Sequence, residues 1–106
     1  MADLDFDLNV THDEQGRCRL TLRGELDLAT AGRLQQALAE GGDDVLLDLR
    51  GLTFMDSTGV RALLEAAENG APGLRIIAPE TGEVRVTIEE TGIAPLLPLV
   101  APEERS

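Results

Sequence analysis

One stretch of the chain, from Val45 to Gly70, changes its hydrophobic period part-way along and so limits the folds that the chain can adopt. It begins with the short apolar run VLLDL, which follows a Gly-Gly-Asp-Asp cluster and predicts a buried strand. After a predicted loop at residues 50–55, apolar residues recur at the spacing of one helix face: Val60, Leu63, Leu64 and Ala67. Charged residues fall on the opposite face, which we expect to meet water: Arg61, Glu65 and Glu68.

Between this strand and this helix lies the tetrapeptide Asp56-Ser57-Thr58-Gly59. The first turn of a helix has four backbone N–H groups without an intrahelical partner, and the side chain of Asp56 or Ser57 can cap one of them. The same N–H groups and the helix dipole favour a bound negative charge. A phosphoryl group on Ser57 would therefore lie in a favourable local field, and we take Ser57 as the candidate functional residue.

The segments before this stretch predict a hairpin and a first helix. Apolar and polar residues alternate over residues 6–10 and again over residues 17–23, and the turn HDEQG lies between the two runs. On the exposed face of this hairpin, Asp5 and Asp7 would lie opposite arginines of the second strand. Thr30 is a suitable N-cap for a helix at residues 31–39, which Gly41-Gly42 would end. With a further short apolar strand at residues 74–78, the order of elements favours parallel strands joined by right-handed helical crossovers.

The C-terminal part of the chain gives conflicting signals. Val84, Val86 and Ile88 alternate with polar residues, so the period alone favours a strand at residues 81–92. Residues 96–100 predict a last edge strand, because Pro95 and Pro98 are tolerated only at the edge of a sheet. We expect residues 101–106 to form a disordered tail.

Composition excludes several classes of function. A chain of 106 residues forms one domain. The formal net charge of −11 argues against binding nucleic acid or an anionic membrane surface, both of which require clustered positive charge. Cys18 is the only cysteine, so an internal disulfide is excluded, and its position in the alternating run predicts a buried thiol. No apolar segment is long enough to span a bilayer or to act as a signal sequence, so we expect a cytoplasmic protein.

Three segments together resemble a known family. The blocks GELDLATAGRLQQAL, VLLDLRGLT and FMDSTGVRALLEA are similar to the STAS domain of bacterial anti-sigma factor antagonists, and the similarity covers about residues 4–100. The resemblance implies a single α/β domain over residues 1–106, with a mixed sheet of four to five strands. The N-terminal hairpin would be antiparallel, parallel βα units would follow, and the helices would lie mainly on one face. It also implies a helix, not a strand, over about residues 82–91.

The resemblance further implies a function for this domain. In this family the antagonist binds an anti-sigma factor with serine kinase activity and releases a sigma factor. The kinase then phosphorylates the serine that matches Ser57, and a PP2C-type phosphatase reverses the modification. The resemblance implies that the partner-binding residues surround Ser57: Glu25, Asp27, Thr30, Asp56, Thr58, Gly59 and Arg61. The domain would be a monomer without a cofactor. Arg61 and the third helix depart somewhat from the antagonist pattern.

Several of these residues also have a simpler explanation that involves no partner. Asp56 and Ser57 could only cap a helix, Glu25 and Asp27 could lie on a solvated loop, and Gly59 could serve either a partner or a crowded helix start. We expect Phe54 to belong to the core. An enzyme is disfavoured because the only histidine, His12, has no placed nucleophile or second metal ligand near it. A different use of the same fold, as a STAS regulatory subunit of a membrane transporter or a signalling scaffold, remains the alternative.

Overall fold

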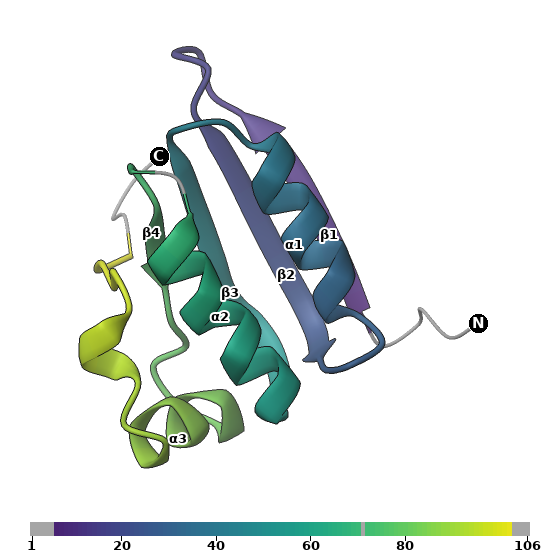
Figure 1. Ribbon diagram of the computed structural model, residues 1–106, viewed down its shortest axis with the longest axis vertical. Helices are drawn as coiled ribbons and strands as arrows, with labels where there is room; N and C mark the ends of the chain where they lie inside the picture. The colour runs from purple at the N-terminus through teal and green to yellow at the C-terminus, as the bar shows by residue number, and fades with distance from the viewer. Residues whose placement is uncertain (1–5, 71, 103–106) are drawn as a thin grey trace.

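The longest strand of the fold, β3 (Val45–Met55), lies inside the sheet and connects the two halves of the domain. The structure, a computed structural model, describes residues 6–70 and 72–102. Before β3 the chain forms β1 (Phe6–His12), β2 (Cys18–Leu26) and α1 (Ala31–Glu40). After it come α2 (Ser57–Asn69), β4 (Arg75–Ile77), α3 (Glu83–Glu90) and a short 3-10 helix, η2 (Ala94–Leu96), as Figure 1 shows.

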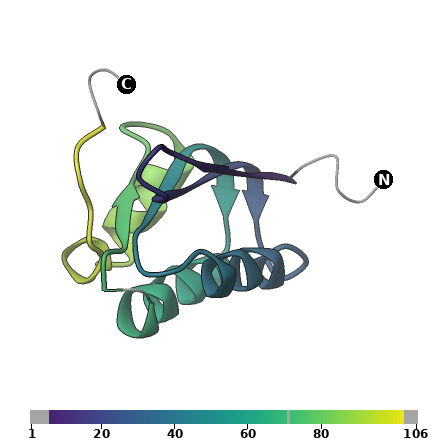
Figure 2. The same cartoon turned by 90° about the horizontal axis from the view of Figure 1, so that it is seen from above.

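The four strands form one mixed sheet in the order β1-β2-β3-β4. β1 is antiparallel to β2, whereas β2, β3 and β4 are parallel to one another. Asp7 lies opposite Arg23 in the hairpin, as predicted, and Asp5 lies outside the described residues. Helices α1 and α2 lie side by side on one face of the sheet (Figure 2), and α3 packs against β3. The predicted fold class is confirmed.

The core between the sheet and the helices is aliphatic. Its largest fully buried side chains are leucine, isoleucine and valine: Leu20, Leu22, Leu26, Leu34, Leu47, Leu49, Leu63, Ile76, Ile77, Ile88, Val45 and Val84. Cys18 is buried among them, as predicted. The prediction that Phe54 belongs to the core is wrong, because its side chain is 40% exposed. Phe54 pairs with Glu25 of β2 just after a shift in the register of the two strands, so simple alternation does not place it.

β3 is longer than predicted, because residues 50–55 continue the strand instead of forming a loop. Asp48, the polar residue inside its apolar run, is only 5% exposed. Its carboxylate accepts hydrogen bonds from Arg19 Nη2 at 2.8 Å and from Arg50 Nη2 at 2.8 Å. It also accepts the Arg50 backbone N–H at 3.0 Å. A buried carboxylate needs such charged donors, so this cluster explains why the strand tolerates an aspartate.

The C-terminal region confirms the helix that the family resemblance implied and corrects the predicted last strand. Residues 83–90 form α3, as the family resemblance implied, and the alternating pattern misleads because Val84 and Ile88 are buried while Val86 is exposed. This i, i+4 spacing is a helical one. The predicted strand at residues 96–100 is largely absent: η2 ends at Leu96, and a single bridge joins Leu99 to Ile76. Of the predicted disordered tail, residues 103–106 lie outside the described residues.

Candidate functional site

The candidate site lies where β2 and β3 end and α1 and α2 begin. Asp56 follows β3 in an extended conformation and is the N-cap of α2. Its Oδ1 accepts the backbone N–H of Thr58 at 2.9 Å and that of Gly59 at 3.2 Å. Its own backbone N–H donates to the Leu26 carbonyl at 3.3 Å, which ties the β3–α2 junction to the end of β2. Of the two capping residues that the sequence allowed, Asp56 is therefore the one that caps.

Ser57 is the first residue of α2, and it is exposed. Thr58, the next residue, is partly buried. Arg61 lies one turn further along α2 and is exposed on its outer face. A hydroxyl in the first turn of a helix lies near the positive end of the helix dipole, so an anionic group on Ser57 would be favoured there. The start of α2 thus leaves Ser57 exposed at the surface of the domain.

Gly59 is buried where α2 passes closest to β2. A Cβ atom at this position would lie 2.6 Å from the Leu26 carbonyl oxygen and 2.5 Å from Met55 Cγ. Both distances are shorter than van der Waals contact, so only a glycine lets the helix begin this close to the strand. Of the two explanations for Gly59, packing inside the domain is therefore sufficient.

The loop between β2 and α1 forms the neighbouring part of the site. Thr30 is the residue before α1 but its hydroxyl makes no cap hydrogen bond, so that part of the prediction is wrong. The hydroxyl instead points back into the loop, where it accepts the Asp27 N–H at 2.9 Å and donates to the Glu25 carbonyl at 3.0 Å. The Asp27 carbonyl accepts the Ala31 N–H at 2.8 Å and so begins the helix. Thr30 is 7% exposed, and it therefore holds the loop that presents Asp27.

Two exposed apolar side chains at this end of the domain were not predicted from the sequence. Leu28, in the β2–α1 loop, is 80% exposed, and Phe54, three residues before Ser57, is also exposed. Phe54 lines an open hollow of about 530 Å³ with residues of α3 and its N-cap: Gly82, Glu83, Val86 and Thr87. A search for apolar residues inside predicted polar loops would have found Leu28.

The described residues contain no group of three or more histidine, cysteine, aspartate or glutamate side chains that could hold a metal ion. No helix in the described part of the chain is long and apolar enough to cross a membrane.

Comparison with known proteins decides the family. A family model described as "Mlab, STAS domain" matches residues 10–98, which is most of the chain. The chain belongs to the STAS-domain family. The resemblance found in the sequence is thereby confirmed. A comparison with curated protein sequences gives no significant match for this STAS domain.

Solved structures that are similar in fold include anti-sigma factor antagonists. One, from Mycobacterium paratuberculosis, is 27% identical over 93% of this chain and 87% of its own, with a TM-score of 0.74. The antagonist SpoIIAA in its unphosphorylated form is 20% identical over 92% of this chain and 90% of its own, with a TM-score of 0.64. The Bacillus cell-fate determinant SpoIIAA in its phosphorylated form is 19% identical over 92% and 93%, with a TM-score of 0.56. The two SpoIIAA comparisons support the fold of this STAS domain.

Proposed function

We propose that this STAS domain is an anti-sigma factor antagonist that is switched off by phosphorylation of Ser57. It binds an anti-sigma factor of the serine-kinase type, and this binding frees the sigma factor. The observation that carries the proposal is the exposed Ser57 at the start of α2, directly after the Asp56 cap. The antagonist from Mycobacterium paratuberculosis supports the general role, and SpoIIAA exists in a phosphorylated form.

A phosphoryl group on Ser57 would act on the partner more than on the domain itself. It adds about −1.5 to −2 charges at neutral pH. The helix dipole stabilises this charge, so the fold persists. Asp56 already accepts the N–H groups of Thr58 and Gly59, so the new phosphate would face a carboxylate and turn outward into the contact surface. A hundredfold loss of affinity corresponds to about 2.7 kcal/mol, which a desolvated like-charge contact can supply.

The partner surface should be basic or mixed in charge. The chain carries a formal net charge of −11, and Glu25, Asp27 and Asp56 all lie at the end of the sheet that presents Ser57. Thr58, Gly59 and Arg61 would extend the contact along the first turns of α2, and Thr30 would act through the loop. The domain acts in the cytoplasm, as a monomer, by binding and not by catalysis. A PP2C-type phosphatase removes the phosphate and resets the switch.

The test mixes the protein with candidate anti-sigma kinases and ATP, and then maps the phosphate by mass spectrometry. We expect modification at Ser57 in the wild type, none in Ser57→Ala, and unchanged modification in the matched control Thr58→Ala. Binding of Ser57→Asp to the anti-sigma factor should be weaker than binding of the wild type. Phosphate on Thr58, or full affinity in Ser57→Asp, would refute the switch.

A second candidate function uses the same fold as a STAS regulatory subunit of a membrane transporter or a signalling scaffold. The observation that favours it is the matching family model, whose description names Mlab and not an anti-sigma factor antagonist. An affinity purification from the native cell distinguishes the two. Recovery of a kinase-type anti-sigma factor supports the first candidate, and recovery of transporter subunits supports the second.

A further inference from the structure

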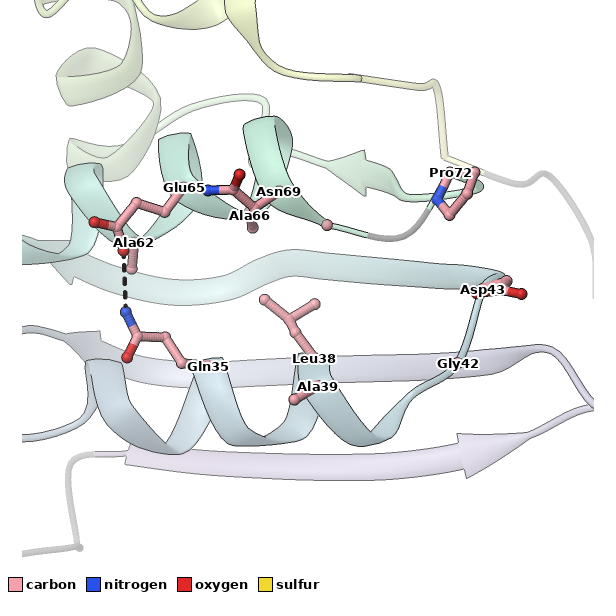
Figure 3. A pocket seen from close by; sticks show the side chains of 11 residues that line it. Gln35, Leu38, Ala39, Gly42, Asp43, Ala62, Glu65, Ala66, Asn69 and Pro72 are labelled. Carbon is pink, nitrogen blue, oxygen red and sulfur yellow. Dashed lines mark hydrogen bonds between the residues drawn. The ribbon is translucent and has the colours of Figure 1, made fainter.

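A groove of about 520 Å³ runs between the C-terminal halves of α1 and α2, away from Ser57. Its floor is apolar, with Ala62 and Ala66 from α2 and Leu38 from α1, as Figure 3 shows. At one end Gln35 Nε2 donates to Glu65 Oε1 at 3.2 Å across the groove. At the other end the Gly73 N–H donates to the Asp43 carbonyl at 2.9 Å and fixes the loops that close it. These hydrogen bonds join the two walls, so the groove is formed before anything binds.

The rim and one end of the groove carry negative charge. α1 and α2 run in the same direction, so the negative ends of both helix dipoles lie together at the end nearest Asp43 and Pro72 (Figures 1 and 3). Neither helix has a basic residue in its last turn. Glu65 and Asp43 line the rim, and none of the described lining residues is basic. Glu40 lies in the last turn of α1 and Glu68 in the last turn of α2, where the negative end of the helix dipole disfavours a carboxylate.

We propose that this groove binds a basic amphipathic helix of a partner protein. Apolar residues of that helix would pack against Leu38, Ala39 and Pro72, which are at least partly exposed, above the buried Ala62 and Ala66. Its lysine or arginine side chains would pair with Glu65, Asp43 and the helix ends. Helix-in-groove recognition uses this combination of an apolar floor and a charged rim. A second copy of this chain is disfavoured as the occupant, because it would bring a further formal charge of −11.

The site is independent of the proposed switch at Ser57. Ser57 begins α2 and Asn69 ends it, and a helix of this length spans roughly 18 Å at 1.5 Å per residue. The groove reaches along α2 only as far as Ala62, five residues or roughly 7.5 Å from Ser57, and Ser57 does not line it. The inference does not rest on the antagonist function, and either can fail without the other.

The experiment follows binding of a synthetic peptide to the ¹⁵N-labelled full chain by NMR. The peptide is an amphipathic helix with leucine and alanine on one face and lysine and arginine on the other. A matched peptide carries glutamine at every basic position. We expect the basic peptide to shift amide signals of the groove residues, with an affinity that falls as salt is raised. The glutamine peptide should bind at least about tenfold more weakly.

A charge-matched pair of variants locates the contact. Asp43→Asn with Glu65→Gln should weaken binding about threefold to tenfold, whereas Glu14→Gln with Glu90→Gln, which removes the same charge elsewhere, should leave it within about twofold. Circular dichroism confirms that both variants fold. Ser57→Asp should bind the peptide as the wild type does. Equal effects of the two charge variants, shifts spread over the acidic surface, or shifts confined to the Ser57 end would overturn the proposal.

Discussion

Replacement of Gly59 by alanine is expected to destabilise the domain, although alanine is the better helix former. The added Cβ would lie 2.6 Å from the Leu26 carbonyl oxygen and 2.5 Å from Met55 Cγ. The methionine side chain can move, but the Leu26 carbonyl belongs to β2 and accepts the Asp56 N–H at 3.3 Å. Overpacking of this kind costs about 1–3 kcal/mol, and helix propensity returns up to about 1 kcal/mol. The net loss should be roughly 1–2 kcal/mol.

Gly32 provides the matched control, because it lies in the first turn of α1 and an added Cβ there meets nothing within 4 Å. Gly32→Ala should leave the free energy of unfolding unchanged or raise it by about 0.5 kcal/mol. Urea denaturation followed by circular dichroism at 222 nm measures both variants, and the midpoint of thermal unfolding should fall by roughly 4–16 °C in Gly59→Ala only. A Gly59→Ala protein at least as stable as the wild type would refute the close-approach argument.

Three further predictions concern other described residues. Asp56→Ala should lower the free energy of unfolding by about 1 kcal/mol through loss of the α2 cap, and equal stability in urea would contradict this. Burial raises the pKa of Asp48, but hydrogen bonds and charge from Arg50, with Arg19, outweigh it and hold the pKa below its ordinary value. Asp48→Asn should therefore cost about 1–3 kcal/mol at pH 7. Because the native pKa is lowered, this difference in the free energy of unfolding is complete above about pH 4 and shrinks as the pH falls through the lowered pKa. A difference that does not depend on pH would refute the ion-pair account. Burial also raises the pKa of the Cys18 thiol, so a disulfide reagent at pH 8 should react slowly with the native protein and rapidly in urea; equal rates would show that the thiol is accessible.

The fold was predictable where one period holds over a whole element. The spacing of Leu63 and its neighbours gave α2 its buried face, and the apolar run from Val45 gave the start of β3. The end of β3 was not predictable in the same way. Register shifts between β2 and β3 break the alternation before Phe54, so a regular pattern can neither extend the strand nor place that side chain. In α3, Val84, Val86 and Ile88 together satisfy a strand pattern, whereas Val84 and Ile88 alone satisfy a helical one, and only tertiary packing decides between the two.

The candidate site was predictable in its position but only partly in its contacts. A cap at the start of α2 follows from Asp56 and Ser57, because one of the two must satisfy the free N–H groups. Thr30 shows the limit of such reasoning. Its residue type and position predict a cap. The hydroxyl instead forms hydrogen bonds with the backbone of Asp27 and Glu25, in a turn that the sequence does not reveal. The groove between α1 and α2 also depends on how the two helices pack side by side on the sheet, which spacing along the chain does not encode.

The exposed ring of Phe54 has a practical consequence for optical measurements. The chain contains neither tryptophan nor tyrosine, so its own near-ultraviolet emission is negligible. A tryptophan in place of Phe54 would give the protein a single indole fluorophore, three residues before Ser57 and partly open to water. The wavelength of its emission would report directly whether that end of the sheet is exposed to water or covered by another molecule, in real time and without any attached dye.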